Sequence, residues 1–214
     1  MEMDTDKKSK LQELKKKMHE DKNLPLREGA NNLVFGDGDS NAEILFIGEG
    51  PGYWEDLKGI PFVGNAGAFL NFLLSSISLK REDVYITNVI HYRAPDNRDP
   101  EPQELEAFKP YLDKIIEIIG PKVVITLGRF SMAKFLPGVS ISKVHGKAKK
   151  VVWNTKEMLV IPMYHPAAGL RSTSIKIQTT EDFKKIPDII KDAQSIKTER
   201  LEENRSNVEQ MKLV

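Results

Sequence analysis

The chain has 214 residues, 40% of them hydrophobic, which is enough for one domain with a sizeable core. It carries 32 Lys and Arg against 31 Asp and Glu, a formal net charge of +1, so any site for a polyanion must come from local clustering of charge. The sequence contains no cysteine, which excludes disulfides, thiol nucleophiles and Cys-ligated zinc or iron–sulfur clusters.

The N-terminal segment is rich in lysine, and its apolar residues Leu11, Leu14 and Met18 follow a helical spacing. This spacing predicts an amphipathic helix over residues 6–20. Residues 1–17 have no apolar stretch typical of a secretory signal, and no run of about 18 apolar residues occurs anywhere. We therefore expect a soluble intracellular protein.

Four short apolar runs rich in branched residues predict buried strands, at residues 44–47, 84–87, 123–127 and 158–161. Helical patterns at residues 69–77 and 105–119 separate the first three runs, and a short helix is expected at residues 129–136. Pro110 is expected to kink or restart the second helix, since proline has no N–H to donate to Glu106. This alternation predicts an α/β fold, a parallel sheet with helices on both faces.

The composition changes near residue 190, where the chain becomes charged and poor in apolar residues. We therefore assign residues 1–190 to one domain. Residues 191–214 are expected to form a charged C-terminal tail, either a frayed helix or disordered.

Ligands of parallel α/β sheets bind beyond the carboxyl ends of the strands. In this sequence turn-forming or hydrogen-bonding residues follow each predicted strand, as Gly48-Glu49-Gly50-Pro51-Gly52, Asn88, Gly128-Arg129 and residues 165–171. The glycine spacing fits neither a Walker A loop nor a dinucleotide fingerprint. The acids Glu49, Glu55 and Asp56 near the first of these loops could orient a water molecule, although acids on loops are commonly just solvated.

Four side chains suit recognition of a base, three in these segments and Phe62 in the loop of residues 59–64, and each also has a structural interpretation. Phe62, between a proline and a glycine, could stack on a planar base or fill the core. The Asn88 amide could read the edge of a base or cap a turn. His165 could donate to a developing anion or be structural. Leu170, followed by a cationic arginine, could wedge into a base stack or belong to a surface loop.

A basic cluster precedes the fourth predicted strand; it comprises Lys143, His145, Lys147, Lys149 and Lys150. Such a run could follow a phosphate backbone or be a solvated hairpin. The histidines other than His165 have no ligand-like spacing, so we infer no metal site.

Together these segments resemble the uracil-DNA glycosylase superfamily, in particular its family 4 branch of bacteria and archaea. Order and spacing agree from about residue 34 to residue 171. The resemblance rests on Gly48-Glu49-Gly50-Pro51-Gly52 with Glu55-Asp56, Gly59-x-Pro61-Phe62-Val63-Gly64, Thr87-Asn88 and His165-Pro166-Ala167 to Leu170-Arg171. Shorter matches are Val34-Phe35-Gly36-Asp37-Gly38, Arg93-Ala94-Pro95-x-Asn97-Arg98 and Leu127-Gly128.

The resemblance implies a three-layer α/β/α sandwich with a central four-stranded parallel sheet. It also implies base flipping and hydrolysis of the N-glycosidic bond of deoxyuridine in DNA, which releases uracil and leaves an abasic site. No lysine stands at a motif position from which it could attack the sugar, so a monofunctional enzyme is expected. Its partner would be uracil-containing DNA. We expect a monomer, without cofactor or membrane contact, in the cytoplasm of a prokaryotic cell and associated with the nucleoid.

The resemblance also implies roles for individual residues. Glu49 would place the attacking water, and His165 would donate to the uracil O2. The base would contact Gly50, Gly52, Glu55, Phe62 and Asn88, with Glu55 helping to exclude thymine, Phe62 stacking on the base and Asn88 reading its edge. The DNA would contact Ala168, Gly169, Leu170, Arg171 and Lys147.

The sequence departs from the family 4 pattern at the four cysteines that usually hold a [4Fe–4S] cluster. Tyr92 and Phe108 stand at two of these places, and Asp21 and Leu24 at approximately the other two. We therefore expect no cluster, and aromatic and aliphatic packing in its place. A second departure is Ala168-Gly169, where bulkier residues are common, which predicts a more flexible insertion loop. The basic segment ending in histidine that marks the covalently bonding branch does not follow Asn88.

Two alternatives to uracil excision stay open. A relative with a shifted preference, for hypoxanthine, xanthine or a modified uracil, is one, because Tyr53 and Trp54 could reshape the pocket. A non-catalytic DNA-binding relative is the other. The combination of Glu49, Phe62, Asn88 and His165 argues against the second, since a pure binding module has no need of all four.

Overall fold

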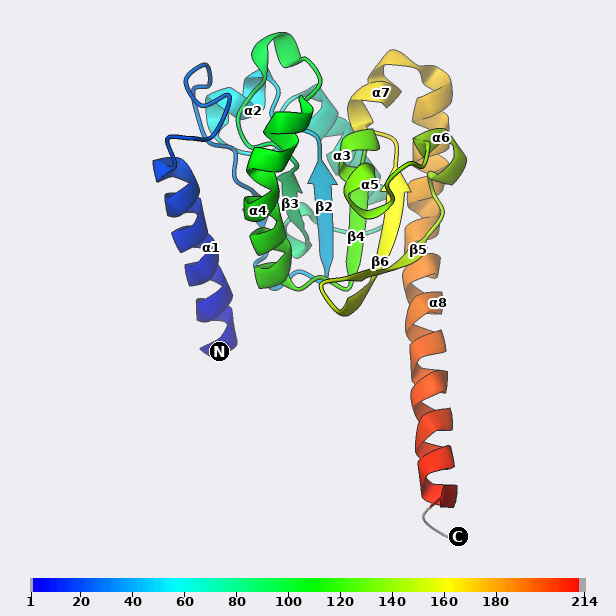
Figure 1. The fold of residues 1–214 in the computed structure, drawn as a ribbon. Helices are drawn as coiled ribbons and strands as arrows, with labels where there is room; N and C mark the ends of the chain where they lie inside the picture. The colour runs from blue at the N-terminus through cyan, green and yellow to red at the C-terminus, as the bar shows by residue number, and fades with distance from the viewer. Residues whose placement is uncertain (1, 212–214) are drawn as a thin grey trace.

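Six strands of the described chain form one mixed sheet at the centre of the protein (Figure 1). The structure is a computed structural model that describes the backbone of residues 2–211 and the side chains of residues 6–192. The strands are β1 (Asp37–Gly38), β2 (Ile44–Gly48), β3 (Tyr85–Asn88), β4 (Val123–Leu127), β5 (Lys149–Trp153) and β6 (Lys156–Met163). Their order across the sheet is β1-β3-β2-β4-β6-β5.

The four central strands β3, β2, β4 and β6 are parallel, which confirms the predicted parallel core. The edge strands β1 and β5 pair antiparallel with β3 and β6 and extend the predicted sheet. Neither edge strand has the continuous apolar run that identified the others. β1 has only two residues, and β5 begins with the exposed pair Lys149 and Lys150.

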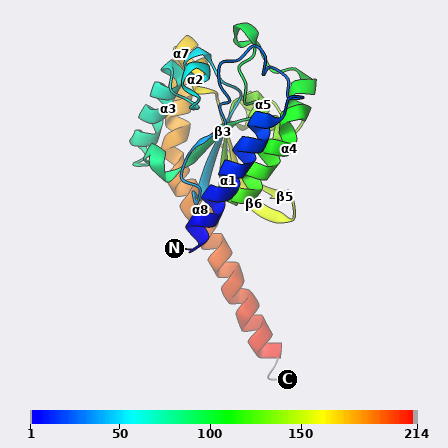
Figure 2. The same ribbon diagram turned by 90° about the vertical axis from the view of Figure 1, so that its left-hand side faces the viewer.

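Helices cover both faces of the sheet, so the predicted three-layer sandwich is confirmed (Figures 1 and 2). The described helices are α1 (Glu2–Glu20), α2 (Tyr53–Lys58), α3 (Asn65–Ser76), α4 (Pro102–Ile119), α5 (Arg129–Phe135), α6 (Ile141–Val144), α7 (Pro166–Arg171) and α8 (Thr173–Met211), with short 3-10 turns at Arg81–Asp83 and Pro95–Asn97. The α1, α4 and α5 helices lie on one face, and α3 and α8 lie on the other.

Alternation along the central strands divides the core into two halves. In β2, Leu45 and Ile47 join the core beneath α1 and α4, whereas Phe46 joins the core beneath α3 and α8, where its ring packs against Phe183. Successive side chains of a strand point to opposite faces, so a near-continuous apolar run supplies both halves. These layers leave the carboxyl ends of the parallel strands free for the loops that follow them.

Pro110 does not interrupt α4, so the expected restart at this residue is wrong. One helix runs from Pro102 to Ile119. Both Pro110 and Glu106 are exposed. The Glu106 carbonyl therefore loses its helical donor on the side that faces water, where solvent can satisfy it.

The places of the family 4 cluster ligands hold side chains that do not fit an iron–sulfur cluster. Leu24, Tyr92 and Phe108 are buried in one apolar core beneath α1 and α4, and the Tyr92 and Phe108 ring centroids lie 6.2 Å apart. The Asp21 carboxylate accepts a hydrogen bond from the Tyr111 hydroxyl (2.6 Å). Such a cluster requires thiolates or an equivalent ligand set, whereas these groups pack and hydrogen-bond with one another.

Truncation of Phe108 is expected to destabilise the fold strongly. This residue of α4 is fully buried, and its ring packs against the rings of His91 and Tyr92. Phe108→Ala should lower the free energy of unfolding by about 3–5 kcal/mol, the usual effect of removing a buried ring. Phe72→Ala is the matched control, since Phe72 is 56% exposed and surface changes usually shift stability by less than about 0.5 kcal/mol. Urea denaturation checks both; equal losses would contradict this account of the core.

The predicted charged tail begins near the end of the described side chains. By its backbone α8 extends to Met211, but the side chains beyond residue 192 lie outside the described part of the chain. Over the part that is described, no helix combines the length and the apolar character needed to cross a membrane.

Candidate functional site

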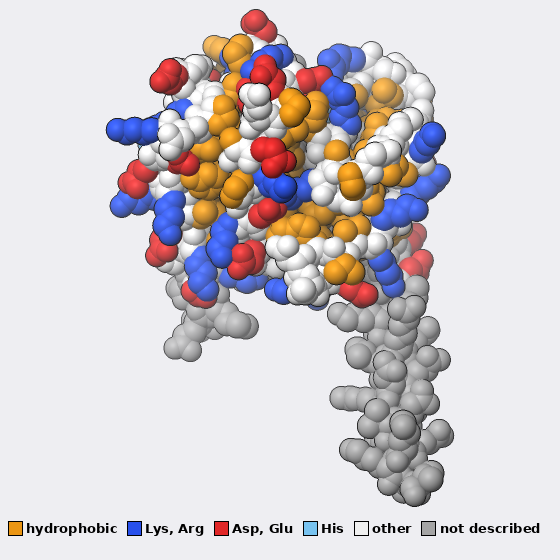
Figure 3. All heavy atoms as spheres, viewed as in Figure 1, with side chains coloured by type: hydrophobic (Ala, Val, Ile, Leu, Met, Phe, Trp, Pro, Cys, Tyr) orange, Lys and Arg blue, Asp and Glu red, His pale blue; other side chains and the backbone are white. Residues whose placement is uncertain are grey.

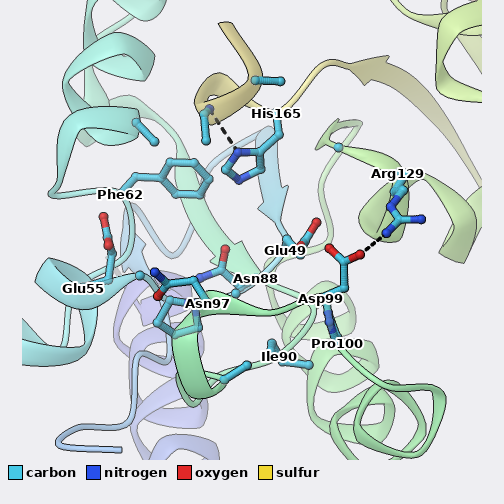
Figure 4. A pocket seen from close by; sticks show the side chains of 18 of the residues that line it. Glu49, Glu55, Phe62, Asn88, Ile90, Asn97, Asp99, Pro100, Arg129 and His165 are labelled. Atoms are coloured by element: carbon cyan, nitrogen blue, oxygen red, sulfur yellow. Dashed lines mark hydrogen bonds and ion pairs between the residues drawn. The ribbon is translucent and has the colours of Figure 1, made fainter. Parts of the chain in front are cut away.

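A cavity of about 640 Å³ opens where the parallel strands end (Figure 4). Loops after β2, β3, β4 and β6 all contribute to its lining, as expected for a sheet of this type. The residues singled out from the sequence that line it are Glu49, Gly50, Gly52, Glu55, Phe62, Asn88, His165, Ala168, Leu170 and Arg171.

Two of the predicted site residues lie away from the cavity lining. Gly169 is buried in α7, where a Cβ atom would lie 2.8 Å from the Phe69 ring, so its smallness lets α7 approach α3. Lys147 is exposed, and its ammonium group donates to the Lys143 carbonyl at 3.3 Å.

The loop that carries Phe62 is held in an unusual backbone conformation. Phe62 has φ of +51°, a left-handed conformation that is uncommon for a residue with a side chain. The Glu55 carboxylate accepts hydrogen bonds from the backbone N–H groups of Val63 and Gly64, both at 2.8 Å. The Arg81 guanidinium donates to the carbonyls of Pro61 and Phe62. A conformation of this kind persists only where its surroundings determine it, as these contacts do.

Asp56, beside Glu55, also has a structural role. Its buried carboxylate accepts hydrogen bonds from the backbone of Asn31 (2.8 Å) and Asn32 (3.2 Å), which ties the N-terminal loop to α2. The interpretation that Glu55 and Asp56 are free to orient a water is therefore wrong for Asp56. Glu55 lines the cavity while holding the Phe62 loop.

Gly48, the last residue of β2, lets the Asn88 and Phe62 side chains approach each other. A Cβ atom at Gly48 would lie 2.4 Å from Asn88 Oδ1 and 2.6 Å from the Phe62 ring, closer than real contacts allow. Only glycine permits this approach. The Asn88 side chain is buried, and its Oδ1 atom has no hydrogen-bond partner within the described protein. A buried acceptor without a partner carries a desolvation penalty that a ligand donor would relieve.

His165 sits at the start of α7, with its ring against that of Phe62 at 5.6 Å between centroids. Its Nδ1 accepts a hydrogen bond from the Ala167 N–H (3.2 Å), so the proton of the neutral ring is on Nε2. Burial, helped by the charge of Arg171, lowers the pKa of His165 to about 4. The side chain is therefore a neutral Nε2–H donor near neutral pH.

Glu49 lines the cavity, and Figure 4 shows its carboxylate beside that of Asp99, which is the more exposed of the two acids. Burial raises the pKa of Glu49, and the negative charge of Asp99 raises it further. The positive charges of Arg129 and Arg171 act in the opposite direction on the same pKa. Arg129 also forms an ion pair with Asp99. The two residues that shift the pKa of Glu49 in opposite directions are therefore in contact with each other.

Several lining residues were not predicted, among them Ile90, Asn97, Asp99 and Tyr164. Asp99 follows β3 by a long loop, so no short spacing signals that it lies near Glu49. Arg129, by contrast, belongs to the Gly128-Arg129 segment predicted to follow a strand, and it does line the cavity. No three carboxylate or imidazole groups among the described side chains converge as a metal site would require.

On one face of the molecule, positive and negative side chains are mixed rather than gathered by sign. On the face drawn in Figure 3, Lys and Arg side chains alternate with Asp and Glu side chains and with apolar ones, as expected from the net charge of +1. This face therefore presents no broad patch of one charge.

Comparison with known proteins agrees with these features. The family model described as the Uracil DNA glycosylase superfamily matches residues 35–190. A type-4 uracil-DNA glycosylase of Archaeoglobus fulgidus is 47% identical over 170 residues, 77% of this chain and 85% of that protein. Proteins of the same name from Sulfurisphaera tokodaii and Thermotoga maritima are 43% and 42% identical, over 84% and 78% of this chain and 84% and 88% of their own lengths.

Proposed function

The chain belongs to the uracil-DNA glycosylase superfamily, and we propose that it hydrolyses the N-glycosidic bond of deoxyuridine in DNA, releasing uracil for repair. One observation carries this proposal. Glu49, Phe62, Asn88 and His165, from four separate segments of the chain, line one cavity at the carboxyl end of the sheet.

Uracil fits the recognition groups of the cavity. Its flat ring would stack on Phe62, whose ring is fixed by the loop described above. Its N3–H would donate to the unpartnered Asn88 Oδ1, and the Asn88 amide N–H would donate to its O4. Cytosine has an acceptor at N3 and a donor at its 4-amino group, the reverse of uracil, so it would leave the Asn88 amide without these two hydrogen bonds. Glu55 forms the adjoining wall and would restrict the room for the 5-methyl group of thymine.

The chemistry of bond cleavage assigns roles to His165 and Glu49. As the C1′–N1 bond breaks, negative charge collects on uracil and positive charge on the sugar. The neutral His165 Nε2–H would donate to the uracil O2 and stabilise the anion. The Glu49 carboxylate would hold the attacking water and face the cationic sugar. Water then adds at C1′, its proton is lost, and an abasic site remains.

Entry of the base into the cavity requires that it leave the helix. An enzyme acting on one base of a duplex must extrude it, which costs a few kcal/mol. Leu170 stands half-exposed at the rim, on α7, and would fill the gap left in the base stack, with Arg171 beside it for a phosphate. No lysine occurs among the described residues that line the cavity. We therefore propose a monofunctional enzyme in which water, not an amine, attacks the sugar.

The acidic limb of the pH–rate profile is expected to report Glu49. Below its pKa the carboxyl is protonated and cannot activate water, so the rate falls as the pH falls. Asp99→Asn removes a charge that raises this pKa and should shift the limb to lower pH. Arg129→Gln removes a charge that lowers it and should shift the limb to higher pH. Single-turnover rates against pH test this; shifts in the same direction would contradict it.

Oligonucleotides with one modified base test the proposed activity and its range. Excess protein should produce alkali-sensitive sites at uracil, in single strands and opposite G or A, and none at thymine. Without alkali the strand should stay intact, as a monofunctional enzyme requires. Cleavage at hypoxanthine or xanthine but not at uracil would replace the proposal by the shifted-preference alternative. DNA binding without base release from any substrate would favour the non-catalytic one.

A further inference from the structure

Two neighbouring aromatic side chains at the start of α2 are exposed and have no role in the cavity. Tyr53 is 53% exposed and Trp54 is 50% exposed, and their rings meet edge to face at 5.2 Å between centroids. We call Tyr53 and Trp54 the α2 aromatic pair. Neither residue is in the cavity lining, so any effect of the pair on the shape of the base pocket would be indirect. Large exposed aromatic groups side by side mark interaction sites on soluble proteins.

The α2 aromatic pair lies directly behind one wall of the cavity. Glu55, the next residue of α2, lines the cavity and holds the loop that presents Phe62. The Trp54 ring packs over the same loop, since a Cβ atom at Gly64 would lie 3.2 Å from Trp54 Cδ1. The pair is thus continuous with the site that takes the flipped base.

A cation joins the pair to a second wall of the cavity. The Arg93 guanidinium lies 5.4 Å from the centroid of the Tyr53 ring. Its Nε donates to Asn97 Oδ1 at 2.8 Å, and Asn97 lines the cavity. The α2 aromatic pair therefore presents aromatic surface with a fixed positive charge at its side, next to the mouth through which DNA would enter.

This combination of aromatic faces and a cation is what single-stranded nucleic acid recognises. Every base offers a flat face for stacking, and every nucleotide carries a phosphate for an arginine. In a duplex the base faces are already covered by their neighbours, whereas a single strand leaves them available. The adjoining cation and base pocket favour a DNA strand over an apolar protein surface as the occupant.

We propose that the α2 aromatic pair is a stacking surface for an unpaired base of the strand that enters the cavity, with Arg93 placed for a nearby phosphate. This inference rests on the proposed function for its location, because the strand must approach the cavity. The pair would thus provide a contact with single-stranded DNA that duplex DNA does not make.

Fluorescence of Trp54 tests the contact directly. The sequence has two tryptophans, so Trp153→Phe leaves Trp54 as the sole reporter. Titration with a uracil-free single strand should quench this emission, because a base stacked directly on the indole ring of Trp54 reduces its fluorescence. A uracil-free duplex of the same length should quench it much less. Unchanged emission on binding of the single strand would overturn the proposal.

Affinity measurements supply the matched control. Trp54→Ala should weaken binding of the single strand about tenfold, as expected for the loss of one base–aromatic stack, and change duplex binding less than about twofold. Phe72→Ala removes an equally exposed aromatic ring from α3 and should leave both affinities and uracil release unchanged. Equal effects of the two substitutions, or equal weakening for single strand and duplex, would overturn the proposal.

These results are separable from the proposed activity. Uracil release by the unaltered protein tests the glycosylase function, and it does not depend on Trp54 fluorescence. Quenching and a selective Trp54→Ala defect in a protein that releases no uracil would support the stacking surface and contradict only the proposed function. Release of uracil, with neither quenching of Trp54 nor a selective defect of Trp54→Ala, would support the proposed function and contradict the stacking surface.

Discussion

His165→Ala is expected to slow uracil release by about 10²–10³-fold, the usual effect of removing one donor aimed at a developing oxyanion. Three features of the structure suit His165 to this proposed role. The Ala167 N–H fixes the tautomer, burial keeps the ring neutral, and Phe62 packs against one face of the ring. Alanine should leave the backbone of α7 intact while removing the group that would donate to the uracil O2 in the proposed mechanism.

Single-turnover kinetics with excess protein measure this effect without interference from product release. Affinity for a uracil-free duplex should change little in His165→Ala, because in the proposed mechanism the ring contacts the flipped base rather than the phosphate backbone. A rate within about threefold of the unaltered protein, well below the loss expected of a missing oxyanion donor, would contradict this role. Because the pKa of His165 is about 4, its protonation should not affect the rate above pH 5.

Glu49→Gln is expected to slow uracil release by about 10²–10⁴-fold, the range attributed to a positioned general base. Glutamine keeps the size of the side chain and its ability to hold a water, but it cannot accept the proton or face the sugar cation with a charge. The remaining rate should lose the acidic limb of the pH profile, since the group that titrates there is gone.

The matched control for Glu49→Gln is Glu43→Gln. Glu43 is an exposed acid that pairs with Lys122 and does not line the cavity. Its substitution should leave both the rate and the pH profile unchanged. A full acidic limb in Glu49→Gln would assign that limb to another group and contradict the role given to Glu49.

The central strands could be predicted from the sequence because each supplies both faces of the sheet. A run such as residues 123–127 is apolar throughout, and every residue of β4 is buried. The edge strands were missed because neither has such a run: β1 has only two residues, Asp37 and Gly38, and β5 begins with two exposed lysines. The restart expected at Pro110 was wrong because the spacing of Phe108 and Leu112 places Pro110 on the exposed side of α4, where water can satisfy the Glu106 carbonyl.

The lining of the cavity was largely predicted, because parallel strands bring their carboxyl ends to one edge. What each acid does there was not. Glu49 and Asp56 look alike in the sequence. In the structure Glu49 lines the cavity, whereas the Asp56 carboxylate accepts hydrogen bonds from the backbone N–H groups of Asn31 and Asn32. The Asp99–Arg129 ion pair joins residues 30 positions apart and leaves no short-range signal. The exposure of Tyr53 and Trp54 likewise depends on how α2 packs.

Direct measurement of the released base tests the central claim best. Duplex oligonucleotides containing a single uracil, or thymine at the same position, are incubated with excess protein and the free bases are quantified by mass spectrometry. We expect free uracil equal in amount to the abasic sites formed, no free thymine, and almost no release by His165→Ala. Absence of free uracil under conditions where the protein is folded and binds the DNA would contradict the account.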